Sequence, residues 1–258
     1  MSTRGVYGFV INGQSKLGVS PSDAYPHGLG TDVLVYLANH TDSQIIEQAK
    51  STQMVRKNEE YFEKALLNQG NLSCSYLIDG TPLIGNGLFC EWAYILNTDN
   101  KTLEVYSGFC EKDKAKGRYT FLSDKPQKVT LLCEISWHSF RKQAVLELQH
   151  KNDSSLSFSF ISTVASSLEH LADLTIHDIK KPSLANSLDI LNKICTEPCL
   201  EFKISIKELP AGTAFKVAGD PFVYIKLLSS ENNCAYNKQT YALKTFENNE
   251  FADIVLVS

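Results

Sequence analysis

Residues 1–30 of the 258-residue chain read MSTRGVYGFVINGQSKLGVSPSDAYPHGLG, and this stretch sets the start of the fold. An apolar run at 6–11 and a second short run at 15–19 are separated by the dipeptide Asn12-Gly13. Asn-Gly between two such runs is the strongest short-range signal for a two-residue hairpin turn. The sequence therefore predicts an amino-terminal β-hairpin, followed by a glycine-containing corner that leads into a helix.

Helical patterns follow the corner, and a second pair of strands follows the helices. Thr31 is a candidate helix cap, and Thr41 with Gln44 fits a capping box that begins another helix. The predicted elements are helices over 33–38, from 41 onward and around 59–68, and strands at 89–96 and 102–106. Strands, then helices, then strands favour an α+β sandwich with a mostly antiparallel sheet.

Three segments are expected along the chain. Residues 1–122 form the amino-terminal αβ domain, and 123–200 form a mixed α/β segment that either extends this domain or stands apart. Within the middle segment we expect strands at 128–136 and 155–162. Residues 141–150 fit either a strand or a helix, whereas 167–174 and 187–194 have helical spacing.

The last segment, 201–258, changes character. Short β-rich runs alternate with turn residues such as Gly219-Asp220-Pro221 and Glu231-Asn232-Asn233. Several short strands at this spacing, in a segment this small, predict a small β-barrel of SH3-like size.

Composition excludes several classes of function. The hydrophobic fraction of 43% and the net charge of −4 are those of an ordinary globular protein. No run of lysine and arginine offers a track for phosphates, so the sequence disfavours nucleic acid as a partner. Because no signal peptide is visible and no apolar run approaches the roughly 18 residues of a membrane span, we expect no membrane contact and a cytoplasmic location.

We expect no cofactor and no bound metal. The seven cysteines are odd in number and irregularly spaced, which indicates reduced thiols rather than a disulfide framework. Cys195 and Cys199, with His170 and His177, lack the usual ligand spacing of a zinc site. Phosphate-loop and zinc-protease motifs do not occur in the sequence.

The corner after the first hairpin is the main candidate site. Gly28 and Gly30 allow tight turning, and Thr31 starts a helix whose first amide groups attract negative charge. Arg4 and His27 would add cationic donors if the fold brings them close. The predicted ligand-binding residues are Arg4, Asp23, Tyr25, His27, Gly28, Gly30 and Thr31.

A second candidate is Ser2 as a catalytic nucleophile. Removal of Met1 would free an α-amine with a pKa of about 7.7–8, which suits a base for the serine hydroxyl. A nucleophile followed by a strand and a hairpin resembles the start of glutamine-amidotransferase and acylase members of the Ntn-hydrolase superfamily. That resemblance covers residues 2–20 and implies an amide hydrolase, with Arg4 as the partner of a substrate carboxylate and Asp23 as an acid/base or orienting group.

A further resemblance covers about thirty residues. Met-Ser-Thr-Arg at 1–4 and the motif Asp23-x-Tyr25-Pro26-x-Gly28-x-Gly30 look like the opening of a group of uncharacterised bacterial and phage proteins. Members of this group often carry glycine at the second position, which favours Arg4, Asp23 and Tyr25 over Ser2 as site residues. The resemblance implies no particular activity.

The leading hypothesis is a non-enzymatic cytoplasmic binding protein, plausibly of phage or mobile-element origin. Its partner would be a small anionic ligand, such as a phosphate or nucleotide, or another protein, with the barrel as an interaction module. The alternatives are an amide hydrolase using Ser2 and a structural or assembly protein in which the motif only folds a loop. The oligomeric state is left open.

Overall fold

The structure is a computed structural model that describes residues 3–151, 156–177 and 184–196, and six strands between 203 and 253. Side chains are described for 3–145, 159–173 and 189–196. Ser2 lies outside the described residues. The chain divides into two compact units, 1–197 and 198–258.

The predicted hairpin is confirmed. Strands β1 (Gly5–Ile11) and β2 (Gln14–Ser20) pair antiparallel across a two-residue turn. Asn12 and Gly13 have φ values of 51° and 73°. Two consecutive positive φ angles match the twist of the flanking strands, and asparagine and glycine adopt them most readily.

The first unit is built on a five-stranded sheet in the order β2-β1-β5-β6-β7. Its remaining strands are β5 (Trp92–Asn97), β6 (Thr102–Glu111) and β7 (Gln127–Ser136). Strands β1 and β5 run parallel, and the other neighbours run antiparallel. The prediction of a mixed α+β fold with a mostly antiparallel sheet is therefore confirmed.

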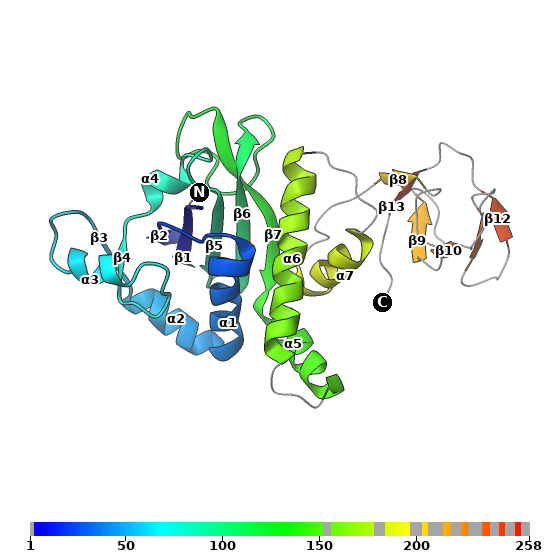
Figure 1. The fold of residues 1–258 in the computed structure, drawn as a ribbon, viewed down its shortest axis with the longest axis horizontal. Helices are drawn as coiled ribbons and strands as arrows, with labels where there is room; N and C mark the ends of the chain where they lie inside the picture. The colour runs from blue at the N-terminus through cyan, green and yellow to red at the C-terminus, as the bar shows by residue number, and fades with distance from the viewer. Residues whose placement is uncertain are drawn as a thin grey trace. The chain divides into compact units, whose positions relative to one another are not determined.

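One face of this sheet is covered by long helices. In Figure 1, α1 (Thr31–Asn39) and α6 (Leu156–His177) cross in front of the sheet. The remaining larger helices are α2 (Asp42–Ser51), α5 (Trp137–Lys151) and α7 (Leu184–Ile194). The predicted capping box of α2 is present, because Thr41 and Gln44 exchange hydrogen bonds between side chain and backbone.

The predicted strand at 155–162 is wrong, because residues 156–162 belong to α6. Ser and Phe alternate over this short stretch and imitate a strand. The longer pattern is helical: the buried apolar residues in the described part of α6 recur at spacings of three and four. They are Phe160, Ile161, Val164, Ala165, Leu168, Leu171 and Ala172.

The opposite face carries the second half of the core. Here the short helix α4 (Thr81–Ile84) and the segment around Tyr119 cover alternate residues of the strands. The buried cluster on this face contains Val6, Val10, Leu17, Ile84, Cys90, Ala93, Ile95, Tyr106, Tyr119 and Val129. Both faces of β1 and β5 are thus buried, so these strands read as apolar runs rather than as alternating patterns.

A small lobe adjoins β2. It contains α3 (Phe62–Leu67), which lies within the helix predicted around 59–68. It also contains a parallel pair of strands, β3 (Gln53–Val55) and β4 (Tyr76–Ile78), and the sequence analysis did not predict this pair. A bridge between Gly18 and Asp79 joins this lobe to the edge strand. Such pairing partly covers the open hydrogen-bonding edge of β2.

The second unit contains six short antiparallel strands. They are β8 (Lys203–Ser205), β9 (Ala214–Val217), β10 (Val223–Lys226), β11 (Cys234–Asn237), β12 (Leu243–Thr245) and β13 (Phe251–Asp253). The sheet order is β12-β11-β10-β9-β13-β8. Among the described residues no pairing joins β12 to β8, so the β-rich prediction holds while a closed SH3-like barrel is not confirmed.

Candidate functional site

The predicted corner packs against the beginning of β1. The amide of Ala24 donates to the carbonyl of Thr3 at 3.1 Å. Ala24 lies so close over Gly5 that a β-carbon on Gly5 would come within 2.5 Å of the alanine methyl. The phenol of Tyr94 on β5 donates to the Ala24 carbonyl at 3.2 Å. These contacts fix residues 23–30 onto the sheet at the amino-terminal ends of β1 and β5.

The backbone amides of the corner donate within the turn. Gly28 and Gly30 donate to the Tyr25 carbonyl at 3.0 and 3.2 Å, and Leu29 donates to Asp23 at 2.9 Å. The Thr31 amide donates to Gly28 in turn. An anion site at a helix start needs amides that point outward without an internal partner. These four amides therefore supply no such donor.

The two glycines of the corner serve close packing. A β-carbon on Gly28 would lie 2.6 Å from Asp23 Cγ, and one on Gly30 would lie 2.9 Å from the Tyr94 hydroxyl. Thr31 was predicted as a helix cap, but it is the first residue of α1 and the cap position is Gly30. The Thr31 hydroxyl instead donates to the Pro26 carbonyl at 3.1 Å, because the turn over 26–30 brings that carbonyl back to the helix start.

The acidic side chains of the corner lie near one another. Asp23 has a φ of 56° and is exposed. Partial burial, and secondarily the charge of Asp23, raises the pKa of the Asp32 carboxyl above its usual range. Tyr25 is 43% exposed. Arg4 is also exposed, and its side chain forms no hydrogen bond or ion pair with the part of the chain that the structure describes.

His27 is directed to α6 rather than to the rest of the corner. Its Nε2 lies 3.1 Å from Ser166 Oγ and 3.9 Å from a carboxylate oxygen of Glu169. A serine–histidine–acid relay needs the hydroxyl and the carboxylate on opposite ring nitrogens. Because both groups approach the same nitrogen here, the arrangement is a surface contact between η1 (Pro26–Gly30) and α6, not a catalytic relay.

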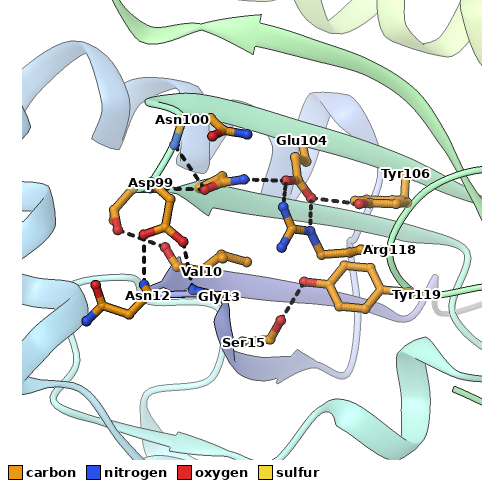
Figure 2. A network of polar contacts seen from close by, with 12 residues as sticks. Val10, Asn12, Gly13, Ser15, Asp99, Asn100, Glu104, Tyr106, Arg118 and Tyr119 are labelled. Carbon is orange, nitrogen blue, oxygen red and sulfur yellow. Dashed lines mark hydrogen bonds and ion pairs between the residues drawn. The ribbon is translucent and has the colours of Figure 1, made fainter.

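A buried polar network lies on the sheet face that α4 and the segment around Tyr119 cover (Figure 2). The sequence analysis did not predict it. The Glu104 carboxylate is 1% exposed. It accepts hydrogen bonds from Arg118 Nε and Nη2 at 3.0 and 2.5 Å, from Asn97 at 2.7 Å and from the Tyr106 phenol at 2.6 Å. Four donors satisfy both carboxylate oxygens, and the bidentate arginine balances the charge. The network therefore has the properties of a structural clamp.

The same end of the sheet is closed by a second set of bonds. Asp99, in the turn between β5 and β6, accepts the amides of Asn12 and Gly13 at 2.7 and 2.8 Å. These hydrogen bonds hold the pKa of Asp99 below its usual range, and the bond from the Gly13 amide has the largest effect. The two hairpin turns are thus joined side by side (Figure 2). We call this region, with the Glu104 network, the turn end of the sheet.

The opposite end of the sheet exposes large apolar side chains. The Phe109 amide donates to the Gly87 carbonyl at 2.8 Å, and Leu122 lies beside Gly85. In Figure 1 the loop between β6 and β7 lies at the end of the sheet near α4. We call this region the open end, and its exposed apolar residues are Leu88, Phe89, Phe109, Phe121 and Leu122.

Comparison with protein-family models, with curated proteins and with solved structures finds no match to this chain. Among the described residues, no three histidine, cysteine, aspartate or glutamate side chains gather in a way that could hold a metal ion. In the same part of the chain, each helix is too short or too polar to cross a membrane.

Proposed function

We propose that the protein is a binding protein whose partner is another protein, and that the partner docks on the open end of the sheet. The observation that carries this proposal is the presentation of Phe109. This residue is 42% exposed, and its φ of 59° is a left-handed conformation that a bulky side chain rarely adopts. Such strain persists only where the surroundings impose it, and it concentrates at functional sites.

The strain at Phe109 has a local cause in the sheet. The pairing of β6 with β7 shifts register between Ser107 and Cys110, which is an irregularity of the β-bulge kind. Bulges bend a strand and redirect a side chain. Here the irregularity falls on the two residues between them, Gly108 and Phe109, and Phe109 is left exposed.

The apolar neighbours of Phe109 support a docking surface. Phe121 is 91% exposed, Leu88 52%, Phe89 51% and Leu122 46%. Single exposed apolar residues are ordinary, but several in one region mark interaction surfaces. Three phenylalanines are also the kind of large apolar anchor that concentrates binding energy at protein interfaces.

The corner residues give weaker support to the small-anion alternative. The amides of 28–31 donate internally, and two carboxylates, Asp23 and Asp32, lie close together beside them. Negative charge and occupied donors both disfavour an anion. The geometry therefore favours the protein partner over the phosphate or nucleotide.

Selection of a randomised peptide library on the intact protein tests this function. We expect peptides to be enriched on the wild type and lost on the variant Phe109→Asn/Phe121→Ser. Asparagine suits the left-handed conformation at 109, so the change removes apolar surface without adding backbone strain. Leu67→Ser is the matched control, because Leu67 is 86% exposed on α3 and lies outside the open end.

Two outcomes would overturn the proposal. Absence of any enrichment on the folded wild type would contradict a peptide-binding surface. Equal enrichment on the wild type and on Phe109→Asn/Phe121→Ser would place binding elsewhere. Far-ultraviolet circular dichroism of each variant establishes that the comparison is made between folded proteins.

The six strands of the second unit would act as a further interaction module if they close into a small SH3-like barrel. Their antiparallel order and short lengths support this proposal. Closure predicts nuclear Overhauser contacts between β12 and β8 in the intact chain. Contacts between every pair of neighbouring strands in this order but none between β12 and β8 would contradict closure. The cytoplasmic location and the phage or mobile-element origin stay predictions.

A further inference from the structure

We infer that the partner docking on the open end is an acidic protein segment that carries apolar anchor residues. This inference rests on the proposed function and adds the chemistry of the partner. Its basis is the charge of the segment that forms much of the open end. Residues 109–128 contain six basic and three acidic residues. Arg118 pairs with Glu104 at the turn end, and the other five basic and three acidic residues give a formal net charge of +2 in a chain whose total is −4.

Not all of these charges are neutralised locally. Lys112 pairs with Asp124 at 3.4 Å, and Lys114 pairs with Glu111 at 3.0 Å. The pairs are exposed, so each contributes little to stability. Within the described residues, Lys116 and Lys125 are exposed and their ammonium groups form no ion pair. Two cations are therefore available to a partner.

A buried lysine adds to the positive potential beneath the open end. Lys128 is 1% exposed, and its Nζ donates to the backbone carbonyl of Ser123 and lies 3.4 Å from Ser123 Oγ. In the described part of the chain no carboxylate lies within 4.0 Å of this ammonium. Buried charge is screened by salt much less than exposed charge.

The same lysine fixes the backbone at Ser123, which directly follows Leu122. Ser123, which Lys128 contacts, donates its hydroxyl to the carbonyl of Gly85 at the end of α4. This chain of bonds ties the residues next to Phe121 and Leu122 to the helix. A surface whose anchors are already positioned loses less conformational entropy when a partner binds.

Arg4 extends the positive surface. Its carbonyl accepts the Glu91 amide at 3.0 Å. The exposed Arg4 therefore faces Glu91, which follows Phe89 by two positions in the sequence. The sequence analysis predicted Arg4 as a cationic donor for a ligand. Its position beside the open end makes it a donor for a carboxylate of the partner instead.

An acidic protein segment fits this surface better than a phosphate-rich surface does. Glu111, Asp113 and Asp124 are interspersed with the lysines and are exposed. The carboxylates among the cations repel the continuous negative charge of a nucleic acid backbone or an anionic bilayer. A protein partner can instead place a carboxylate opposite each lysine and avoid the acidic residues of the surface. Five exposed apolar residues also give such a segment anchors to cover.

The experiment uses the same library selection. It determines the amino-acid composition of the enriched peptides and measures how their affinity changes with lysine substitutions and with salt concentration. We expect enriched peptides to combine leucine or an aromatic residue with aspartate and glutamate. Their affinity should fall about tenfold for Lys116→Glu/Lys125→Glu and several-fold when the salt concentration rises from about 50 to about 300 mM. Lys50→Glu/Lys57→Glu is the control, because it changes the charge equally away from the open end.

Each result separates the two proposals. Enriched peptides that are apolar but neutral, with no response to Lys116→Glu/Lys125→Glu, would overturn the acidic partner and leave the docking function intact. Loss of enrichment to the same extent in the lysine control would also overturn it. An oligothymidylate, or vesicles of phosphatidylserine and phosphatidylcholine, that bind the open end while no peptide does would overturn both proposals.

Discussion

The two ends of the five-stranded sheet differ in what they bury: the turn end buries a charged side chain, and the open end leaves apolar side chains exposed. At the turn end a carboxylate, Glu104, is removed from water and given four donors. At the open end, Phe109, Phe121 and their apolar neighbours remain in water. Burying a charge is tolerated only when its hydrogen bonds are complete, whereas exposing apolar groups is favoured only if something else covers them. The first end therefore stabilises the fold, and the second is the surface that we propose for docking.

The comparison also shows that a polar cluster need not be a binding site. The polar cluster around Glu104 has all its hydrogen bonds made within the sheet. The open end carries few groups with distinctive chemistry. Its significance comes from the exposure of Phe109 and Phe121 and from the strained backbone at Phe109.

The largest expected effect lies at the turn end. Arg118→Met removes the bidentate partner of Glu104 and keeps the aliphatic stem. The substitution leaves the buried Glu104 carboxylate without a compensating charge, so we expect a loss of about 3–5 kcal/mol in the free energy of unfolding. Urea denaturation measures this change. The double variant Arg118→Met/Glu104→Gln should recover part of the loss, because the unpaired charge is then absent.

Lys112→Met is the control for this substitution. The partner of Lys112, Asp124, is fully exposed, so its loss should have no measurable effect on unfolding. A cost for Arg118→Met as small as that of Lys112→Met would show that the turn end is not a clamp, and the contrast between the two ends would fail.

A smaller effect is expected at the corner. Gly30→Ala would place a β-carbon 2.9 Å from the hydroxyl of the fully buried Tyr94. Overpacking of this kind costs about 1–3 kcal/mol, which thermal unfolding followed by circular dichroism would detect. Gly85→Ala is the matched control, because its nearest neighbours lie 3.6 Å away and its backbone is already helical. Equal stability of the two variants would contradict tight packing at Gly30.

Asp99→Ala tests the turn end through the pH dependence of the free energy of unfolding. The variant loses two hydrogen bonds to the hairpin turn, and we expect a cost of about 1 kcal/mol near neutral pH. The folded-state pKa of Asp99 lies below the unfolded value of about 3.9, so the contribution is full above that value and is lost as pH falls through the folded pKa.

Unfolding of the wild type and of Asp99→Ala should therefore differ at pH 7 and converge under acid conditions. Asp113→Ala is the control, because Asp113 is exposed and accepts no hydrogen bond from the described part of the chain. A difference that stays constant down to the lowest accessible pH would show that the Asp99 bonds do not depend on its charge.

The smallest effect on stability is expected at the open end. Phe121→Ser should change the free energy of unfolding by less than about 0.5 kcal/mol, because the ring is 91% exposed. The same substitution should lower the binding of a hydrophobic dye by the folded protein. A clear loss of stability would show that Phe121 is packed in solution, which would remove it from the docking surface.

Local signals in the sequence were reliable where neighbours in the chain decide the structure. The Asn12-Gly13 turn depends on backbone angles that these two residues favour, and the Thr41 capping box depends on a spacing of three residues. The strand predicted at 155–162 is wrong, because a short local alternation of serine and phenylalanine lies within the longer helical spacing of α6.

The sequence by itself determined the hairpin, the α2 cap, the mostly antiparallel α+β fold and the glycine corner, because each depends on local angles, spacing or composition. Tertiary structure alone decided the parallel pairing of β1 with β5 and the meeting of Glu104 with Arg118. It also decided that Phe109, whose amide donates to the carbonyl of Gly87, is exposed next to the segment that contains Leu88. Burial and charge compensation depend on which strands become neighbours, and that information is distributed over the whole chain rather than held in any one motif.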